Sequence, residues 1–445
     1  MGKIAKAMPT SNLNAAKRAK NDEFYTQWHD IEMEINAYLE ANPHLFRGKT
    51  VLCPCDDPEW SNFTKLLALN FQDYGIKKLI STSYAPDSKR YPTNYQPTLF
   101  EQQSPQFAPE KTATHGKLFV LDHDTNHDHR VDIDDLQWQY LQGDGDFRSA
   151  EVSALLQEAD LVITNPPFSL FREFLAWLID AHKQFAIIGN MNAITYKEVF
   201  PLIKDNKLWL GATIHSGDRE FGVPDEYPLE ASGWRVDENP LDCKGRRKPY
   251  TKYLRIKGVR WYTNIEHGRR HAPLQLMTMA DNLKFSRHSI IREQGYPEYD
   301  NYQAIEVPYT DAIPSDYPGV MGVPISFLDK YCPEQFEIVN ANDFRRDPSV
   351  PPKKHGLIKD KEARITLDAP TAENADSAER ERERVQDNLR APLHPTPCSP
   401  QVLMDGTSTA NAPTPASLSA AYYDMVARPA LQGIKTYRRI FIRAK

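Results

Sequence analysis

The chain has 445 residues, of which 40% are hydrophobic and 26% are charged, and its formal net charge is −6 at pH 7. This length allows two domains or one large domain with an appended one, and the apolar fraction excludes a wholly disordered chain. The chain contains no run of about 18 apolar residues, so the sequence predicts no membrane span. The polar start of the chain does not resemble a secretory signal peptide.

The charge is distributed unevenly along the chain. Residues 1–20 carry five Lys and Arg and no acid, which predicts a basic flexible arm. Residues 242–292 carry 13 Lys and Arg against three Asp and Glu, a net charge of +10. Such a stripe is typical of a surface that binds phosphates, although an ordinary solvated face is the alternative.

Short apolar runs alternate with helical periodicity between residues 49 and 192. The runs predict strands at 50–54, 78–83, 160–164 and 185–189, and the periodic segments predict helices at 63–71, 148–158 and 170–182. Strands separated by helices predict an α/β fold with a parallel sheet that carries helices on both faces. Ligands of such sheets bind at the carboxyl ends of the strands, so the residues that follow each strand are the first candidates for a site.

Other segments depart from this alternation. Residues 85–114 are polar and contain Pro and Gln, which predicts a long excursion between sheet elements. Residues 343–432 are rich in Pro and Ala with almost no apolar periodicity, which is typical of a disordered insert. Residues 437–443 predict a strand again, so we expect the insert to loop out between two structured parts.

Neither cysteines nor acidic runs predict a metal site. The five Cys are too scattered for a disulfide framework, and no second Cys or His pair completes a zinc site. The acidic run at 122–135 lacks the Gly and Glu of a calcium loop at its sixth and twelfth positions, so we expect a solvated loop there. We therefore expect a reduced, cytoplasmic protein that uses no metal and no membrane.

The sharpest feature is Asn165-Pro166-Pro167-Phe168, which directly follows a predicted buried strand. Two prolines hold the backbone extended and rigid, so the Pro166 carbonyl stays available as a hydrogen-bond acceptor. The Asn165 amide oxygen is a second acceptor, and Phe168 offers a flat ring. Two acceptors beside an aromatic ring suit a planar substrate with an exocyclic amino group. The alternative is a proline-terminated strand followed by a core phenylalanine.

The tetrad resembles the [DNS]-P-P-[YF] motif of class I S-adenosylmethionine-dependent methyltransferases that act on exocyclic or amide nitrogens. Longer runs are similar to the EcoRI group of adenine-specific DNA methyltransferases over about residues 21–339 and the terminal strand. These runs are 160–174, 22–27, 56–58 with 61–63, 143–149, 187–190 with 194–199, and 320–324.

The resemblance implies a Rossmann-like class I methyltransferase sheet with helices on both faces, and a C-terminal DNA-recognition region. It implies S-adenosylmethionine as cofactor, bound by Asp22, Phe24, Tyr25, Thr26, Asp56, Asp57, Pro58, Asp144, Asp146 and Phe147. Either Asp144 or Asp146 would bind the cofactor's adenine amine, with Phe147 packed on that ring. A helix N-cap is an equal alternative for Asp56, a turn is the alternative for Asp144 and Asp146, and a core aromatic is the alternative for Tyr25.

The implied substrate is an adenine that must swing out of the double helix, which costs a few kcal/mol. Phosphate contacts offset part of this cost, and the basic segment is the expected source. The candidate DNA-binding residues are Arg246, Arg247, Lys248, Lys252, Arg255, Arg260, Arg269 and Arg270, with Trp261, Tyr262 and Asn264 interleaved among the cations. The implied partners are double-stranded DNA and a cognate restriction endonuclease that acts on the same site.

The expected function is thus sequence-specific methylation of adenine N6, with Asn165, Pro166, Pro167 and Phe168 as catalytic residues. Cytosine N4, an RNA base or a protein glutamine are alternative targets, and a catalytically silent DNA-binding module is an alternative of another class. The expected organisation is an arm at 1–20, a catalytic domain at 21–210, a target-recognition region at 211–342, the insert at 343–432 and a terminal strand at 433–445.

Overall fold

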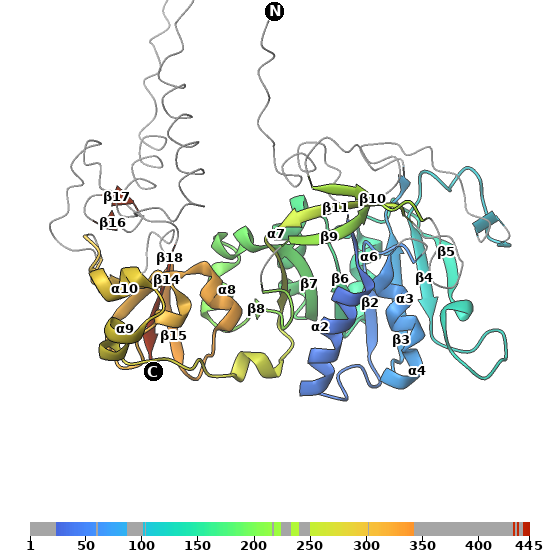
Figure 1. Ribbon diagram of the computed structural model, residues 1–445. Coiled ribbons are helices and arrows are strands. Elements are labelled where there is room, and N and C mark those ends of the chain that lie inside the picture. Colours follow the sequence, from blue (N-terminus) through green and yellow to red (C-terminus); the bar gives the residue numbers. More distant parts are fainter. Residues whose placement is uncertain are drawn as a thin grey trace, which may run out of the picture.

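A computed structural model (Figure 1) describes a chain of α/β class with mixed sheets. The described residues are 24–58, 61–86, 101–102, 104–215, 218–223, 233–239, 250–300, 302–341, 430–431, 434–435 and 439–445. Several sequence predictions lie outside these ranges, namely the basic arm, Asp22, Arg246, Arg247, Lys248 and residues 343–429 of the expected insert.

The largest sheet has eight strands in the order β5-β4-β3-β2-β6-β7-β12-β8. Its four central strands are parallel. They correspond to the four strands predicted from the sequence. In sheet order they are β3 (Lys78–Ser83), β2 (Thr50–Cys53), β6 (Leu161–Thr164) and β7 (Gln184–Asn190). Both β2 and β6 are buried at every position, which is why their apolar runs predict them correctly.

Antiparallel strands flank this parallel centre, so the sheet is mixed and not parallel throughout as the sequence predicts. On one side lie β4 (Lys117–Leu121) and β5 (Gln137–Tyr140), and on the other lie β12 (Val259–Thr263) and β8 (Trp209–Leu210). Exposed glutamines alternate with Trp138 in β5, and β12 contains a charged residue, so neither forms an apolar run. Because β12 belongs to this sheet, the domain boundary expected at residue 210 falls inside it.

Helices cover both faces of the large sheet because alternate strand residues point to opposite sides. Val51 and Cys53 pack in one core, with α2 (Trp28–Ala41), α3 (Asn62–Leu69) and α4 (Phe71–Tyr74). Leu52 packs in the other core, with α6 (Ala150–Glu158), α7 (Phe171–Asp180) and α8 (Phe200–Lys204). The buried residues of α7 are Phe171, Phe174, Leu175 and Leu178, the spacing that predicts this helix from the sequence.

A small antiparallel sheet lies along one end of the large sheet (Figure 1), in the order β1-β9-β11-β10. Its strands are β1 (Tyr25–Thr26), β9 (Asp218–Val223), β11 (Lys252–Lys257) and β10 (Trp234–Val236). The chain turns from β11 into β12 at Gly258, whose φ of +67° favours glycine. The Gly258 carbonyl accepts from Met191 N–H at 2.6 Å, which fixes this turn at the carboxyl end of β7.

A third sheet, in the order β13-β14-β18-β15, forms the C-terminal part of the described chain. Its strands are β13 (Ala304–Glu306), β14 (Val320–Pro324), β18 (Arg439–Ala444) and β15 (Phe336–Ala341). The strand expected at 437–443 is therefore present as β18, hydrogen-bonded between β14 and β15. Glu306 and Arg439 form a buried ion pair in this sheet, with Nη2 and Oε1 2.6 Å apart.

Shorter elements complete the described chain. The helices α9 (Met279–Phe285) and α10 (Ser289–Gln294) pack together, and β16 (Ala430–Leu431) pairs with β17 (Ile434–Lys435). The 3₁₀ helices are η2 (Ile133–Asp135), η3 (Phe168–Leu170), η4 (Met191–Thr195), η5 (Gly268–His271), η6 (Thr310–Ala312) and η7 (Ile325–Lys330). In the part of the chain that is described, every helix is too short or too polar to cross a bilayer.

A buried ion pair joins the large sheet to the C-terminal part. Arg260 of β12 donates from Nε and Nη2 to the two carboxylate oxygens of Asp329 in η7, at 2.7 and 2.9 Å. Arg260 also donates to the carbonyls of Val259 and His215, so its guanidinium is fully used inside the protein. Burial raises the pKa of Asp329, and the adjacent guanidinium opposes this shift.

We expect Arg260→Met to destabilise the fold by about 3–5 kcal/mol, because Asp329 would be left buried without its counter-charge. The double variant Arg260→Met with Asp329→Leu should recover most of this loss, since no unpaired charge remains. Urea unfolding followed by circular dichroism measures both. Arg255→Met, which removes an exposed cation 3.6 Å from Glu220, is the control and should cost less than about 1 kcal/mol. Equal losses for Arg260→Met and the control would contradict the structural role.

Candidate active site

The carboxyl ends of β2, β3, β6 and β7 lie at one edge of the large sheet because these strands are parallel. Hydrogen bonds tie the loops of this edge together. Thr164 Oγ1, at the end of β6, donates to the Pro54 carbonyl, and Asp56 N–H donates to the Thr82 carbonyl at 2.7 Å. The loops that follow β2, β3 and β6 therefore lie together at this edge, where the sheet rule places a ligand.

Asn165 comes directly after β6 and its side-chain amide is anchored by one end only. Its Nδ2 donates to the Phe24 carbonyl at 2.6 Å. Its Oδ1 is buried and has no hydrogen-bond partner among the described residues. A buried acceptor without a donor is costly, so this oxygen is a candidate to receive a donor from a ligand.

The two prolines keep the backbone extended beyond Asn165. Pro167 has φ −53° and ψ 125°, which is an extended conformation. The following turn closes with Leu170 N–H donating to the Pro167 carbonyl at 3.0 Å, one residue after Pro166. This places the Pro166 carbonyl before η3, where it can act as a second acceptor beside Asn165.

The Phe168 ring lies in the protein core. It is 5% exposed and contacts Phe24 and Phe221, with ring centroids 5.7 and 6.3 Å away. Phe24 and Phe221 also contact each other at 5.9 Å. This packing against two aromatic neighbours matches the core-phenylalanine alternative.

The short strand β1 is held in place from both sides. Tyr25 stacks on Tyr250 with centroids 5.7 Å apart and planes 3° apart, and Tyr250 fills the space over Gly222, where a side chain would collide with it. Asn62 Nδ2 donates to the Thr26 carbonyl at 2.8 Å and to Tyr250 Oη at 3.2 Å. Thr26 Oγ1 is buried and has no partner among the described residues, so this strand also offers a polar atom toward a ligand.

Asp56 acts as a structural anchor for the start of α3. One carboxylate oxygen accepts from Ser61 Oγ, and the other accepts from Thr64 N–H and Oγ1 at 3.0 and 2.5 Å. Burial raises the pKa of Asp56 to about 6. These contacts match the capping alternative and leave the carboxylate little capacity for a ligand. Asp57 and the buried Pro58 complete the turn, in which Asp57 O accepts from Ser61 N–H at 2.7 Å.

The loop from Gly143 to Phe147 lies beside the end of β3, where Ala85 N–H donates to the Asp144 carbonyl at 2.7 Å. Asp146 is paired with Arg148 at 2.6 Å, which lowers the pKa of Asp146. Asp144 is half-buried, and its carboxylate accepts from Asp146 N–H at 3.1 Å. Phe147 is 3% exposed, and its ring packs against Phe174 and Trp177.

The candidate DNA-binding cations divide into buried and exposed groups. Arg260 is buried in its ion pair with Asp329. Arg270 lies 3.8 Å over the Trp209 ring and is paired with Glu266. Neither guanidinium reaches a phosphate in this conformation. Their hydrogen-bonding capacity serves the fold. The remaining described candidates lie at or near the surface and are Lys252, Arg255 and Arg269.

The aromatic and polar residues interleaved with these cations are also structural. Trp261 and Tyr262 are buried in β12. Asn264 accepts from Phe185 N–H at 2.8 Å and donates to the Lys183 carbonyl at 2.9 Å, which fixes the start of β7. Charge clustering in the sequence does not distinguish such internal residues from surface ones.

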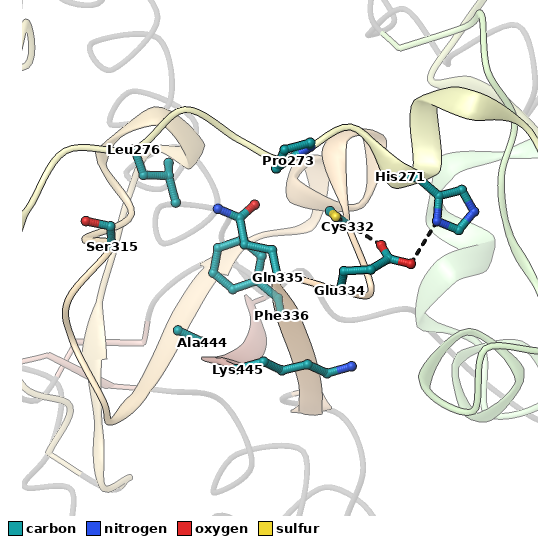
Figure 2. Close-up of a pocket in the computed structure, with 10 residues that line it drawn as sticks. All are labelled: His271, Pro273, Leu276, Ser315, Cys332, Glu334, Gln335, Phe336, Ala444 and Lys445. Atoms are coloured by element: carbon teal, nitrogen blue, oxygen red, sulfur yellow. Dashed lines mark hydrogen bonds and ion pairs between the residues drawn. The ribbon is translucent and has the colours of Figure 1, made fainter.

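A pocket of about 410 Å³ lies elsewhere, beside the C-terminal sheet (Figure 2). Its lining residues are His271, Pro273, Leu276, Ser315, Cys332, Glu334, Gln335, Phe336, Ala444 and Lys445. His271 contacts Glu266 at 2.9 Å and Glu334 at 2.8 Å, and both carboxylates raise the pKa of the imidazole. None of these residues belongs to the loops around Asn165. Over the described ranges, His, Cys, Asp and Glu side chains form no group of three that could hold a metal ion.

The sequence analysis names Phe24 as a cofactor-binding candidate but misses its backbone contact with Asn165. It also misses Phe221 and Tyr250, which pack across strands that are distant in sequence. Backbone groups leave no signal in side-chain identity. The short pattern Phe221-Gly222-Val223 was the available signal, because a glycine inside a strand indicates close approach of another group.

The sequence was compared with known proteins. Residues 12–445 match the family model described as adenine-specific methyltransferase EcoRI. The chain is similar to the type II methyltransferase M.EcoRI of Escherichia coli, with 42% identity over 74% of this chain and 88% of that protein. It is 32% identical to M.MpnI of Mycoplasma pneumoniae and 33% identical to M.MgeORF184P of Mycoplasma genitalium, over 74% of this chain and 85% and 86% of theirs. No solved structure gives a significant match.

The raised pKa of Asp56 makes fold stability depend on pH. Its folded pKa of about 6 exceeds the unfolded value of 3.8, so its contribution is most favourable below about pH 4 and is lost as the pH rises to about 6. We expect the stability of the wild type relative to Asp56→Asn to fall over this window, by at most about 3 kcal/mol. Urea unfolding at several pH values measures the difference. A pH-independent difference would contradict the assignment.

Proposed function

The chain belongs to the EcoRI family of adenine-specific methyltransferases, and we propose that it transfers a methyl group from S-adenosylmethionine to N6 of adenine at specific sequences in double-stranded DNA. Family membership makes it an enzyme of adenine-specific methylation. The observation that carries the proposed site is the buried Oδ1 of Asn165, directly after a central strand, which has no hydrogen-bond partner in the described part of the chain.

In the proposed mechanism, Asn165 and Pro166 orient the amino group of the substrate. Asn165 Oδ1 accepts one N6 hydrogen and the Pro166 carbonyl accepts the other, which aims the nitrogen lone pair at the methyl donor. Both acceptors also favour the positive charge that develops on the nitrogen. The bound cofactor supplies an electrophilic methyl group on a sulfonium. The amine proton is then lost to solvent or to a weak acceptor, since the motif contains no strong base.

The residues at the carboxyl edge fit such a cofactor in part. Among the described residues, none hydrogen-bonds to the buried Thr26 Oγ1. The Asp144 carboxylate accepts a hydrogen bond from Asp146 N–H at one oxygen, whereas the Asp146 carboxylate is paired with Arg148. We therefore assign the cofactor's adenine amine to Asp144 and its methionine end to the Tyr25–Thr26 strand. Asp57 and Pro58 would line the same surface. Asp56 would support it indirectly by holding the turn before α3.

The order of the large sheet supports a Rossmann-like class I architecture. Its centre is parallel, and the reversed strand β12 lies between β7 and β8 at one side. Since β12 completes this sheet, we propose that the DNA-recognition region consists of the segment after residue 263 together with the surface of the small sheet. Lys252 and Arg255, with Arg246, Arg247 and Lys248 close to them in sequence, would contact phosphates.

DNA is the proposed partner because an adenine inside a duplex must leave the stack to reach Asn165. The relatives are named type II methyltransferases. We therefore propose that this enzyme protects sites that a cognate restriction endonuclease would cut.

The test incubates purified protein with tritiated S-adenosylmethionine and unmethylated bacteriophage DNA, and digests the product to nucleosides. N6-methyldeoxyadenosine is the expected product. If the label is found on deoxycytidine, the target is cytosine and not adenine N6. If label is incorporated only into RNA or protein substrates, the target is an RNA base or a protein side chain. Retention of DNA without any label would indicate the silent binding module. Modification-sensitive sequencing of the product then identifies the recognised sequence.

Replacing Asn165 tests its role directly. We expect Asn165→Ala to lower kcat by about 10²–10³-fold, because it removes one positioned acceptor, with little change in the Kd of S-adenosylmethionine. Asn165→Asp keeps an acceptor but loses the donor to Phe24 O, so we expect intermediate activity. Asn42→Ala, at the end of α2, is the matched control and should retain full activity. Equal losses of kcat and cofactor affinity in Asn165→Ala would argue against this role.

A further inference from the structure

Trp234 is a large aromatic residue on the surface of the small sheet, 48% exposed. Cross-strand pairing places it on one face in a row with Leu254 of β11, Phe221 of β9 and Thr26 of β1. The inner three residues of this row are at most 2% exposed. The row therefore begins in the core and ends at an uncovered tryptophan on the edge strand.

Val236 repeats this pattern two residues along β10. It is 47% exposed and lies opposite Lys252 of β11, which in turn lies opposite the buried Val223 of β9. Trp234 and Val236 thus form an apolar surface on the side of β10 that continues the core-facing side of the sheet. An exposed tryptophan with a neighbouring valine on an edge strand favours contact with a partner.

The opposite face of the same strands is filled by the protein's own side chains. Arg235 lies 3.9 Å over the Tyr253 ring and pairs with Glu220 at 3.0 Å. Tyr253 contacts Tyr250, which stacks on Tyr25. On this face the rings of Tyr253, Tyr250 and Tyr25 pack together, and Arg235 and Arg255 remain exposed as charged groups. The exposed apolar side chains of β10, Trp234 and Val236, lie on the other face.

Trp234 lies on the same side of the sheet as the proposed catalytic motif. Phe221, in its row, is 6.3 Å from the Phe168 ring. Two strand spacings separate β10 from β9, which is about 10 Å. This distance corresponds to about three nucleotide steps of a DNA strand, at about 3.4 Å each. A strand that delivers an adenine to Asn165 would therefore pass within reach of Trp234.

Charge and shape favour nucleic acid as the occupant. In sequence, residues 233–257 carry eight Lys and Arg against three Asp and Glu. The strands β10 and β11 form the edge of the four-stranded small sheet and are called the β10–β11 ribbon below. Strands of antiparallel sheets contact DNA grooves in several classes of DNA-binding protein. Aromatic side chains stack on bases irrespective of sequence, which suits a contact near a base that must leave its helix.

We propose that the β10–β11 ribbon contacts the DNA strand that carries the target adenine, and that Trp234 stacks on a base about three nucleotide steps from that adenine. This inference rests on the proposed function, because the occupant is its DNA substrate. The same sheet holds Phe24, whose carbonyl orients Asn165. A DNA contact at β10 is therefore linked to the orientation of the Asn165 amide through the strands β11, β9 and β1.

The test measures Trp234→Ala and Trp234→Phe with unmethylated bacteriophage DNA and tritiated S-adenosylmethionine. We expect Trp234→Ala to raise the KM for DNA by about fivefold or more, with kcat changed by less than about twofold. Trp234→Phe should recover most of the affinity because it keeps a stacking ring. The salt dependence of KM should not change, since no charge is removed. Leu69→Ala, an exposed apolar residue at the far end of α3, is the matched control.

Three results would overturn the inference. The first is a KM for DNA in Trp234→Ala that stays within twofold of the wild-type value. The second is an increase in the KM for DNA in Trp234→Phe as large as that in Trp234→Ala. The third is a weakened affinity of Trp234→Ala for S-adenosylmethionine while its DNA binding is unchanged. Filter retention of labelled DNA, measured without cofactor, separates this inference from the proposed function. Retention that depends on Trp234 would support the ribbon contact even if no adenine were methylated.

Discussion

The hydrogen bond from Asn165 Nδ2 to the Phe24 carbonyl fixes the orientation of the side-chain amide. In the proposed mechanism, this orientation turns the amide oxygen toward the substrate. An amide has a donor and an acceptor at nearly the same place, so it presents an acceptor reliably only if its NH₂ group is held elsewhere. The Phe24 carbonyl is fixed in turn by β1, which pairs with β9 and is held by Asn62 and Tyr250. The antiparallel sheet thus orients a residue that belongs to the parallel one.

The arginines and lysines of residues 242–292 divide into buried side chains that stabilise the fold and surface side chains that are candidates to bind phosphates. Arg260 and Arg270 are buried against Asp329 and against Trp209 with Glu266, where their planar donors hold the large sheet to its neighbours. Lys252 and Arg255 lie on the small sheet, toward solvent. A net positive stripe in a sequence therefore overstates the cations available to a phosphate backbone. Lys252 lies on the face of the small sheet that bears Trp234, and Arg255 lies exposed on the opposite face.

The sequence predicts the centre of this fold well and its periphery poorly, for a physical reason. Strands buried on both faces are continuous apolar runs, so β2, β3, β6 and β7 and the helices between them are found within two residues of their predicted limits. Strands such as β5 and β12 expose one face or bury a charge, so they lack that signal. At the site, Asn165 is predictable from its motif. Whether Asp56 caps a helix or Phe168 lies in the core depends on neighbours distant in sequence, which no local pattern encodes.

The placement of β18 has a consequence for how the chain is made. This strand lies between β14 and β15, yet residues 342–438 separate it from β15 in sequence. At a synthesis rate of about 5–20 residues per second, β14 and β15 wait roughly 5–20 s for the strand that joins them. During that interval both have unpaired backbone edges, which are sites of aggregation. The nascent chain therefore carries an incomplete sheet until β18 is synthesised. A chaperone that binds the unpaired edges of β14 and β15 would improve the yield of folded enzyme.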